Sequence, residues 1–190
     1  MKYIPNLRLN NFLQLKNEIV TNWESLNNLN CSRDKINPYW IKIYDLLHVD
    51  TNLPELEKTK EFLKTYNLEN LQIVIYLPYA NTGFHIDGNV NRYLIPIQSS
   101  KDAINFELDE FYLLNSQKIS YFQNKVRWNH PPTQIVDGFN WINQENKNNK
   151  MFVINEGECI EIGKNWHAHI NNHFNHRIIL VFDTKEPINL

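Results

Sequence analysis

Two short clusters contain residue types that can bind a metal ion. The first is GFHIDGNVNRYLIPIQ (83–98), in which His85 and Asp87 lie two positions apart. On extended backbone both side chains project to the same face, so an imidazole and a carboxylate can hold one ion together. The second is NWHAHINNHFNHRIILVFD (165–183), which contains four of the seven histidines. Neither cluster is specific by itself, because an H-x-D triplet arises easily by chance and a histidine-rich turn can bind zinc adventitiously.

The second cluster predicts a β-hairpin. Its residues read as a strand (WHAHI), a turn (NNHFN) and a returning strand (RIILVFD). An antiparallel hairpin centred near residues 172–173 brings His167 and Arg177 into the same neighbourhood. Arg177 opens a strongly apolar strand, where a charge is otherwise costly, so we expect it to have a partner such as a bound carboxylate.

Joined, the two clusters supply two histidines and one carboxylate. This is the ligand set of the non-haem Fe(II) oxygenases, which leaves three coordination positions open for a cosubstrate and dioxygen. A structural zinc site would instead close its shell with four protein ligands and would favour cysteine. The two cysteines, Cys31 and Cys159, lie far apart and match no CxxC pattern. An arginine fork binds carboxylate bidentately, which suits the distal carboxylate of 2-oxoglutarate.

At this point the sequence resembles the aspartyl/asparaginyl β-hydroxylase branch of the 2-oxoglutarate/Fe(II) dioxygenases, over roughly residues 71–185. Three spacings carry the resemblance: H-x-D with an arginine seven positions after the histidine (His85, Asp87, Arg92), a histidine four positions before an asparagine (His167, Asn171), and an arginine ten positions after that histidine (Arg177). Only His167 satisfies the last two spacings together. His169 shares its strand face and is the alternative, while His173 and His176 are expected in an exposed turn.

The resemblance implies a role for each of these residues. It implies that Fe(II) is held by His85, Asp87 and His167, with 2-oxoglutarate as cosubstrate and O2 as oxidant. It also implies that Arg177 clamps the 5-carboxylate and that Arg92 is a second cosubstrate or substrate contact; the alternative for Arg92 is a surface arginine at a strand start. The remaining candidates have two readings each: Asn171 contacts the cosubstrate or shapes the turn, and Tyr76 and Trp166 line the pocket or belong to the core.

The implied reaction is hydroxylation of an amino-acid side chain in a protein or peptide. Some members of the asparaginyl hydroxylase branch have no carboxylate at the position of Asp87, whereas this chain keeps it, so a full triad is expected. The membrane anchor and helical-repeat region of the animal endoplasmic-reticulum enzymes are not found in this sequence, so their substrate, asparagine or aspartate in a folded disulfide-rich domain, is not expected to carry over. Two alternatives stay open: the same chemistry on a free amino acid such as proline, and a non-catalytic cupin-like binding module.

The first seventy residues are expected to form a helical support region. Apolar residues recur at helical spacing over 10–27, namely at Phe12, Leu13, Leu15, Ile19, Val20 and Trp23. A second helix is indicated by Asn52 as N-cap, Pro54 in the first turn and Glu55 three residues after the cap. Its apolar stripe is Leu56, Phe62, Leu63 and Tyr66.

From residue 71 the pattern changes to short β-branched or aromatic runs, typical of strands. They lie at 71–78, 92–98, 111–114, 118–123, 151–155, 158–162 and 177–183. The prediction is a mainly β fold with flanking helices, a double-stranded β-helix (jelly roll, cupin-like). Residues 1–190 form a single domain with its oxygenase core at 71–190, and the irregular insert 124–150 is a candidate lid.

Composition excludes several other classes of protein. A length of 190 residues suits one domain, and a net charge of −2 with scattered Lys and Arg argues against nucleic-acid binding. No apolar run has the roughly 18 residues that a membrane span needs. The N-terminus lacks a secretory signal, so a reducing cytoplasm is the expected location. The expected partner is a peptide, protein or amino-acid substrate.

Overall fold

A computed structural model of the chain describes residues 2–4, 7, 9–21, 41–46, 53–78, 80, 87, 90–99, 103–107, 150–162, 167–171 and 173–188. The elements along the chain are β1 (Lys2–Ile4), α1 (Phe12–Thr21), β2 (Ile41–Asp45), α3 (Pro54–Lys64), β3 (Leu68–Tyr76), β4 (Asn91–Gln98), β5 (Ala103–Glu107), β6 (Lys150–Phe152), β7 (Cys159–Ile162), β8 (His167–Asn171) and β9 (Arg177–Thr184). A six-stranded sheet has the order β1-β7-β4-β9-β3-β2, and a three-stranded sheet has the order β6-β5-β8.

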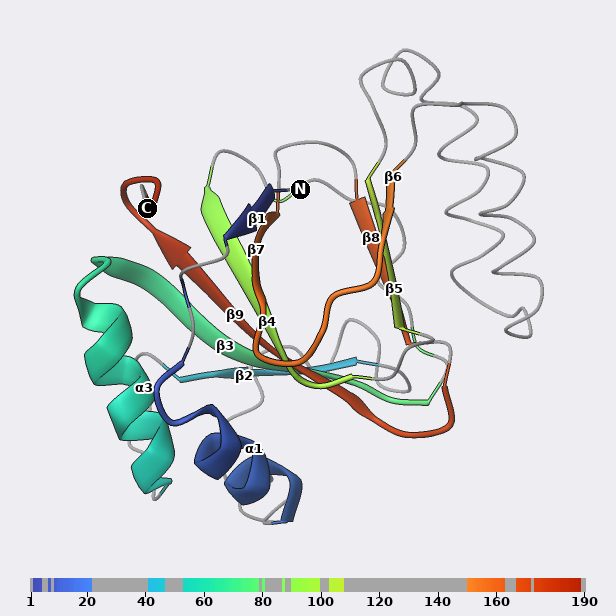
Figure 1. The fold of residues 1–190 in the computed structure, drawn as a ribbon, viewed down its shortest axis with the longest axis horizontal. Coiled ribbons are helices and arrows are strands. Elements are labelled where there is room, and N and C mark those ends of the chain that lie inside the picture. The colour runs from blue at the N-terminus through green and yellow to red at the C-terminus, as the bar shows by residue number, and fades with distance from the viewer. Residues whose placement is uncertain are drawn as a thin grey trace.

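The two sheets and two helices form a cupin-like jelly roll. Every strand pair in both sheets is antiparallel. Figure 1 shows α1 and α3 on one side of the six-stranded sheet and the three-stranded sheet on the other. The predicted fold class, mainly β with flanking helices, is therefore confirmed.

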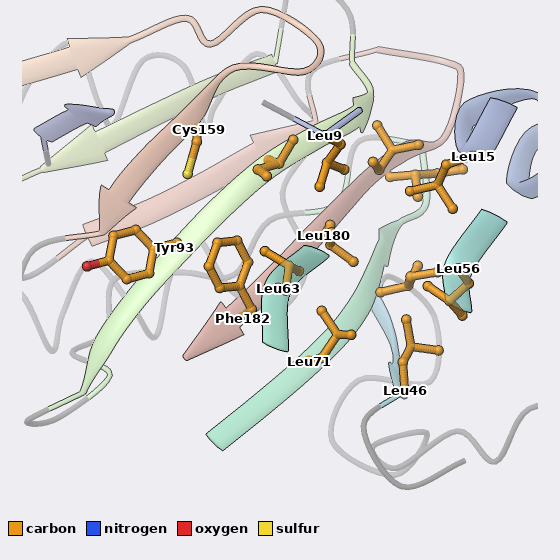
Figure 2. Packing of buried hydrophobic residues seen from close by; sticks show 14 of the residues in the cluster. Leu9, Leu15, Leu46, Leu56, Leu63, Leu71, Tyr93, Cys159, Leu180 and Phe182 are labelled. Carbon is orange, nitrogen blue, oxygen red and sulfur yellow. The ribbon is translucent and has the colours of Figure 1, made fainter. Parts of the chain in front are cut away.

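The central strand β9 divides the interior into two parts, because its residues point alternately to opposite faces. All eight of its residues are buried. Leu180 and Phe182 pack in the cluster that holds the helices, and Figure 2 shows both there with Leu56 and Leu63 of α3. Ile179 and Val181 belong to the other cluster, between the sheets. Arg177 and Asp183 share the parity of that second pair, so both face the interior of the roll.

Both predicted helices are present, with two local corrections. α1 buries Leu15 and Ile19, as predicted, but Leu13 and Val20 are exposed and do not belong to its buried stripe. The predicted cap of the second helix, Asn52, is wrong by one residue. Leu53 is the N-cap residue of α3, because Pro54 occupies the first helical position directly after it. The Leu53 side chain forms no cap hydrogen bond.

The first seventy residues also contain two strands that were not predicted. β1 pairs with β7 and β2 pairs with β3, so each forms an edge of the six-stranded sheet. Short edge strands take much of their stability from the neighbour they pair with, which a local sequence pattern does not show. The structure thus joins this prefix to the β core through backbone pairing as well as helix packing.

Two predicted strands and the predicted insert fall on residues that the structure does not describe. The predicted strands at 111–114 and 118–123, and the insert 124–150 except its last residue, lie outside the described residues. Among the residues that are described, no helix has the length and apolarity to cross a membrane. Cys159 is a buried free thiol in the helix-side cluster, and burial raises its pKa above the usual value.

Candidate metal and cosubstrate site

Asp87 and His167 meet inside the roll, although they are eighty residues apart in the sequence. Nε2 of His167 lies 3.0 Å from Oδ2 of Asp87. The His167 side chain is 1% exposed and that of Asp87 is 14% exposed. His167 is the first residue of β8, in the three-stranded sheet, and Asp87 lies in the segment before β4 of the other sheet. The site is therefore formed where the two sheets face each other.

Arg92 holds the other oxygen of the Asp87 carboxylate. Its Nη1 donates to Oδ1 of Asp87 at 2.6 Å, while Nε and Nη2 donate to the two oxygens of Asp183 at 2.7 and 2.8 Å. Burial alone would lower the Arg92 pKa, but the two carboxylates outweigh it and raise the pKa above its ordinary value. Arg92 is thus a partly buried arginine that is ion-paired with Asp87 and Asp183, and not a solvated surface arginine.

A polar row on β5 and β8 borders this pair, and half of it was missed in the sequence. In the β5–β8 register Glu107 is opposite His167, and Asn105 is opposite His169. All four side chains are buried. The sequence signal for β5 is the alternation in AINFE, where Ile104 and Phe106 separate the two polar residues. This strand therefore buries polar side chains, Asn105 and Glu107, which is unusual for a strand.

One amide oxygen links Arg177 of the large sheet to His169 of the small one. Oδ1 of Asn105 accepts a hydrogen bond from Nη2 of Arg177 at 2.7 Å and lies 2.8 Å from Nδ1 of His169. Since an amide oxygen can only accept, Nδ1 of His169 carries a proton and donates it here. The ring of His169 is 5.3 Å from that of His167, so this link adjoins the Asp87–His167 pair.

Arg177 is a deeply buried cation. It is 1% exposed, and its guanidinium lies 5.6 Å from the centre of the Tyr76 ring. Burial lowers the Arg177 pKa to about 10, and burial also raises the pKa of Tyr76. Tyr76 belongs to the apolar cluster between the sheets, so it is a core residue that also borders the site.

Asn171 fastens the turn after β8 to the end of β3. Its Nδ2 donates to the backbone oxygens of Leu77 at 3.0 Å and Asn175 at 2.7 Å. Its backbone nitrogen donates to the oxygen of Ala80 at 2.8 Å. These contacts agree with the turn-shaping role, and a contact with the cosubstrate stays a prediction.

The predicted hairpin of β8 and β9 is wrong. β8 pairs with β5 in the three-stranded sheet, whereas β9 pairs with β3 and β4 in the six-stranded sheet. The bend at 173–175 carries the chain from one sheet to the other, with His173 and His176 partly exposed. His167 and Arg177 still border one interior, but they reach it from opposite sheets.

Two of the three predicted ligands, Asp87 and His167, are among the described residues, and the third, His85, lies outside them. Trp166, a candidate pocket residue, also lies outside them. Within the described part of the chain no group of three His, Cys, Asp or Glu forms a complete metal site. The pair that is described nevertheless fits an ion. Adjacent ligands of an octahedral ion with bonds of about 2.1 Å are about 3.0 Å apart. The separation of Oδ2 in Asp87 from Nε2 in His167 is 3.0 Å.

The charges around the pair also suit a cation. Asp87 and Asp183 carry two negative charges, and Arg92 between them carries one positive charge, which leaves a net charge of −1 on the trio. A carboxylate oxygen and an imidazole nitrogen together are donors that Fe(II) accepts. The fold is therefore a cupin-like jelly roll that brings a buried histidine and a partly buried carboxylate together between its two sheets.

One solved structure shares this fold at a TM-score above 0.5. The chain superposes on the crystal structure of an oxidoreductase of the 2OG-Fe(II) oxygenase family from Burkholderia pseudomallei with a TM-score of 0.51 and 15% identity, covering 87% of this chain and 76% of that one. An oxalate decarboxylase from Bacillus subtilis with Mn(II) centres gives a TM-score of 0.45 at 12% identity, covering 87% of this chain and 30% of that one. A cupin domain from Bordetella pertussis Tohama I gives 0.35 at 9% identity, covering 62% and 81%. No protein-family model and no curated protein sequence matches the chain.

Proposed function

We propose that this protein is an Fe(II)- and 2-oxoglutarate-dependent dioxygenase that hydroxylates an amino-acid side chain in a protein or peptide. The proposal rests on the short distance between Asp87 and the buried His167, with 3.0 Å between Oδ2 and Nε2. The aspartyl/asparaginyl β-hydroxylases are the members whose residue spacings the sequence resembles. The shared fold with a 2OG-Fe(II) oxygenase family structure is consistent with this chemistry.

The protein supplies the ligands and their orientation. Asp87 and His167 would hold the ion, and we assign His85 as the third ligand from its H-x-D spacing. Bound there, Fe(II) supplies the redox chemistry that couples decarboxylation of 2-oxoglutarate to hydroxylation of the substrate by O2, with succinate and CO2 as the other products.

Arg177 is the residue that we assign to the distal carboxylate of 2-oxoglutarate. It faces the interior from β9, and its hydrogen bond to Asn105 orients the guanidinium without neutralising its charge. A carboxylate brought to this buried group forms a strong charge-assisted bond, because the surroundings screen the charges weakly.

Apolar side chains lie on the same face of the six-stranded sheet as Arg177 and Asp183. Leu94, Ile160, Ile179 and Val181 belong to the cluster between the sheets and exclude water from it. A free amino acid is the alternative substrate. A protein or peptide substrate would extend beyond the space between the sheets, whereas a free amino acid would not. We also propose a cytoplasmic location, which the free thiol of Cys159 supports.

The proposal is tested by adding Fe(II) and 2-oxoglutarate to the protein without oxygen. We expect the weak visible absorption band of a 2-oxoglutarate chelate on Fe(II), because two histidines and one carboxylate would not fill the coordination shell of the ion. The Asp87→Ala and His167→Ala variants should lose the band, while Lys16→Gln, whose ion pair with Glu156 lies outside the site, should keep it. Folded wild-type protein without the band, or a double variant that retains it, would overturn the assignment.

A further inference from the structure

Three neighbouring strands carry a polar row at the end of β9 opposite to Arg177. In the registers of the six-stranded sheet, Asp183 of β9 is paired with Arg92 of β4 on one side and with Asn70 of β3 on the other. Asn70 Nδ2 donates to Oδ2 of Asp183 at 3.2 Å. Asp183 is 5% exposed. Its carboxylate thus has partners on both neighbouring strands, and all eight residues of its own strand, β9, are buried.

The guanidinium of Arg92 is shared between this fixed carboxylate and Asp87. Its Nε and Nη2 form the two-pronged contact with Asp183, and Nη1 reaches Oδ1 of Asp87. A planar guanidinium held by two parallel bonds has little freedom to rotate. The direction of its third bond, and therefore the position of Oδ1 in Asp87, is set by the sheet.

We propose that Arg92 and Asp183 are positioning residues that make Asp87 present a single oxygen, Oδ2, to the metal ion. With Oδ1 occupied by Arg92, the carboxylate meets the ion through one atom and leaves the other coordination positions to the cosubstrate and O2. The inference rests on the proposed function and changes the role of Arg92, which the sequence resemblance gave as a cosubstrate or substrate contact.

The charges distinguish the two roles of Arg92. Three of its nitrogens already donate to carboxylate oxygens of Asp183 and Asp87. A cosubstrate carboxylate at Arg92 would have to compete with these two bound anions. Arg177, by contrast, donates its Nη2 to the neutral amide of Asn105.

Binding of Mn(II), followed by its electron paramagnetic resonance signal, tests the inference without any turnover. Removing a positive charge near a cation site would by Coulomb's law alone tighten cation binding. The positioning role requires the opposite result, because an unrestrained Asp87 binds less well. We expect Arg92→Gln to weaken Mn(II) binding by about 10- to 100-fold, the range for residues that orient a ligand. At saturating Mn(II), the affinity of the Arg92→Gln variant for 2-oxoglutarate should stay near the wild-type value.

Two further variants complete the test. Lys16→Gln is the matched control, since Lys16 also forms an ion pair and has a side-chain exposure of 30%, against 22% for Arg92. Arg92→Lys keeps the positive charge but lacks the planar guanidinium that contacts both oxygens of Asp183, so it should also weaken Mn(II) binding. It replaces Arg92→Gln in the test if that variant does not fold. Unchanged or tighter Mn(II) binding in a folded Arg92 variant, or a selective loss of 2-oxoglutarate affinity, overturns the inference. Wild-type protein that binds no Mn(II) overturns the proposed function instead.

Discussion

Asn105 offers one oxygen to two side chains from different sheets. Its Oδ1 accepts from Arg177 and from the protonated Nδ1 of His169. This contact gives the buried His169 a place beside the site that does not require it to bind the ion. It also explains why an arginine at the start of an apolar strand is tolerated, because Asn105 satisfies part of its hydrogen-bonding capacity.

Arg177 gives the first test at the level of single residues. We expect Arg177→Met to raise the 2-oxoglutarate concentration needed for half-saturation, at a cost of about 2–5 kcal/mol of binding free energy. The reason is that the variant removes one partner of a buried charge pair. Titration of the metal-loaded protein with 2-oxoglutarate measures the change, and the exposed Lys185→Met is the control. Equal half-saturation in both variants would show that the distal carboxylate binds elsewhere.

β5 is the element that the site needs and that the sequence pattern concealed. Strands are recognised by apolar residues on their buried face, whereas β5 buries Asn105 and Glu107. The polar face makes sense only when Arg177 and His169 are known to lie against it. Local alternation in AINFE indicates a strand, but it does not indicate which face is buried.

The hairpin error has a related cause. An apolar run, a short polar turn and a second apolar run are common to a hairpin and to a chain that crosses between sheets. The long-range pairing of β9 with β3 and β4 decides the outcome, and no local feature of residues 165–183 reports it. His167 and Arg177 were still predicted to share one site, because both possibilities place them at the same end of the roll.

The helices can be tested through their packing. Leu56 of α3 is 0% exposed and lies in the cluster between the helices and the sheet, so Leu56→Ala should lower the free energy of unfolding by about 2–5 kcal/mol. Leu13 of α1 is 69% exposed, and Leu13→Ala should change it by less than about 0.5 kcal/mol. Urea denaturation gives both values. A similar loss in both variants would contradict the assignment of the buried faces.

The whole molecule combines two interiors with different tasks. One lies between the helices and the six-stranded sheet and is apolar; Figure 2 shows Leu15, Leu71 and Tyr93 in it. The other lies between the sheets, where apolar residues of β3, β4, β7 and β9 adjoin the histidines and carboxylates. The sequence predicted the fold class because several strands, such as those at 71–78, 92–98 and 177–183, are distinct apolar runs, although β1, β2 and β5 were not predicted. His167, Asp87 and Arg177 stay proposed site residues, chosen because their spacings resemble those of a known family, whereas no spacing marks Glu107 and Asn105.

A crystal structure of the protein with Mn(II) and 2-oxoglutarate, grown without Fe(II), tests the central claim most directly. We expect the anomalous signal of manganese within bonding distance of Oδ2 in Asp87 and Nε2 in His167, with His85 as the third protein ligand. The 5-carboxylate of 2-oxoglutarate should contact Arg177. Manganese bound away from Asp87 and His167, or a 2-oxoglutarate molecule whose distal carboxylate avoids Arg177, would contradict the account.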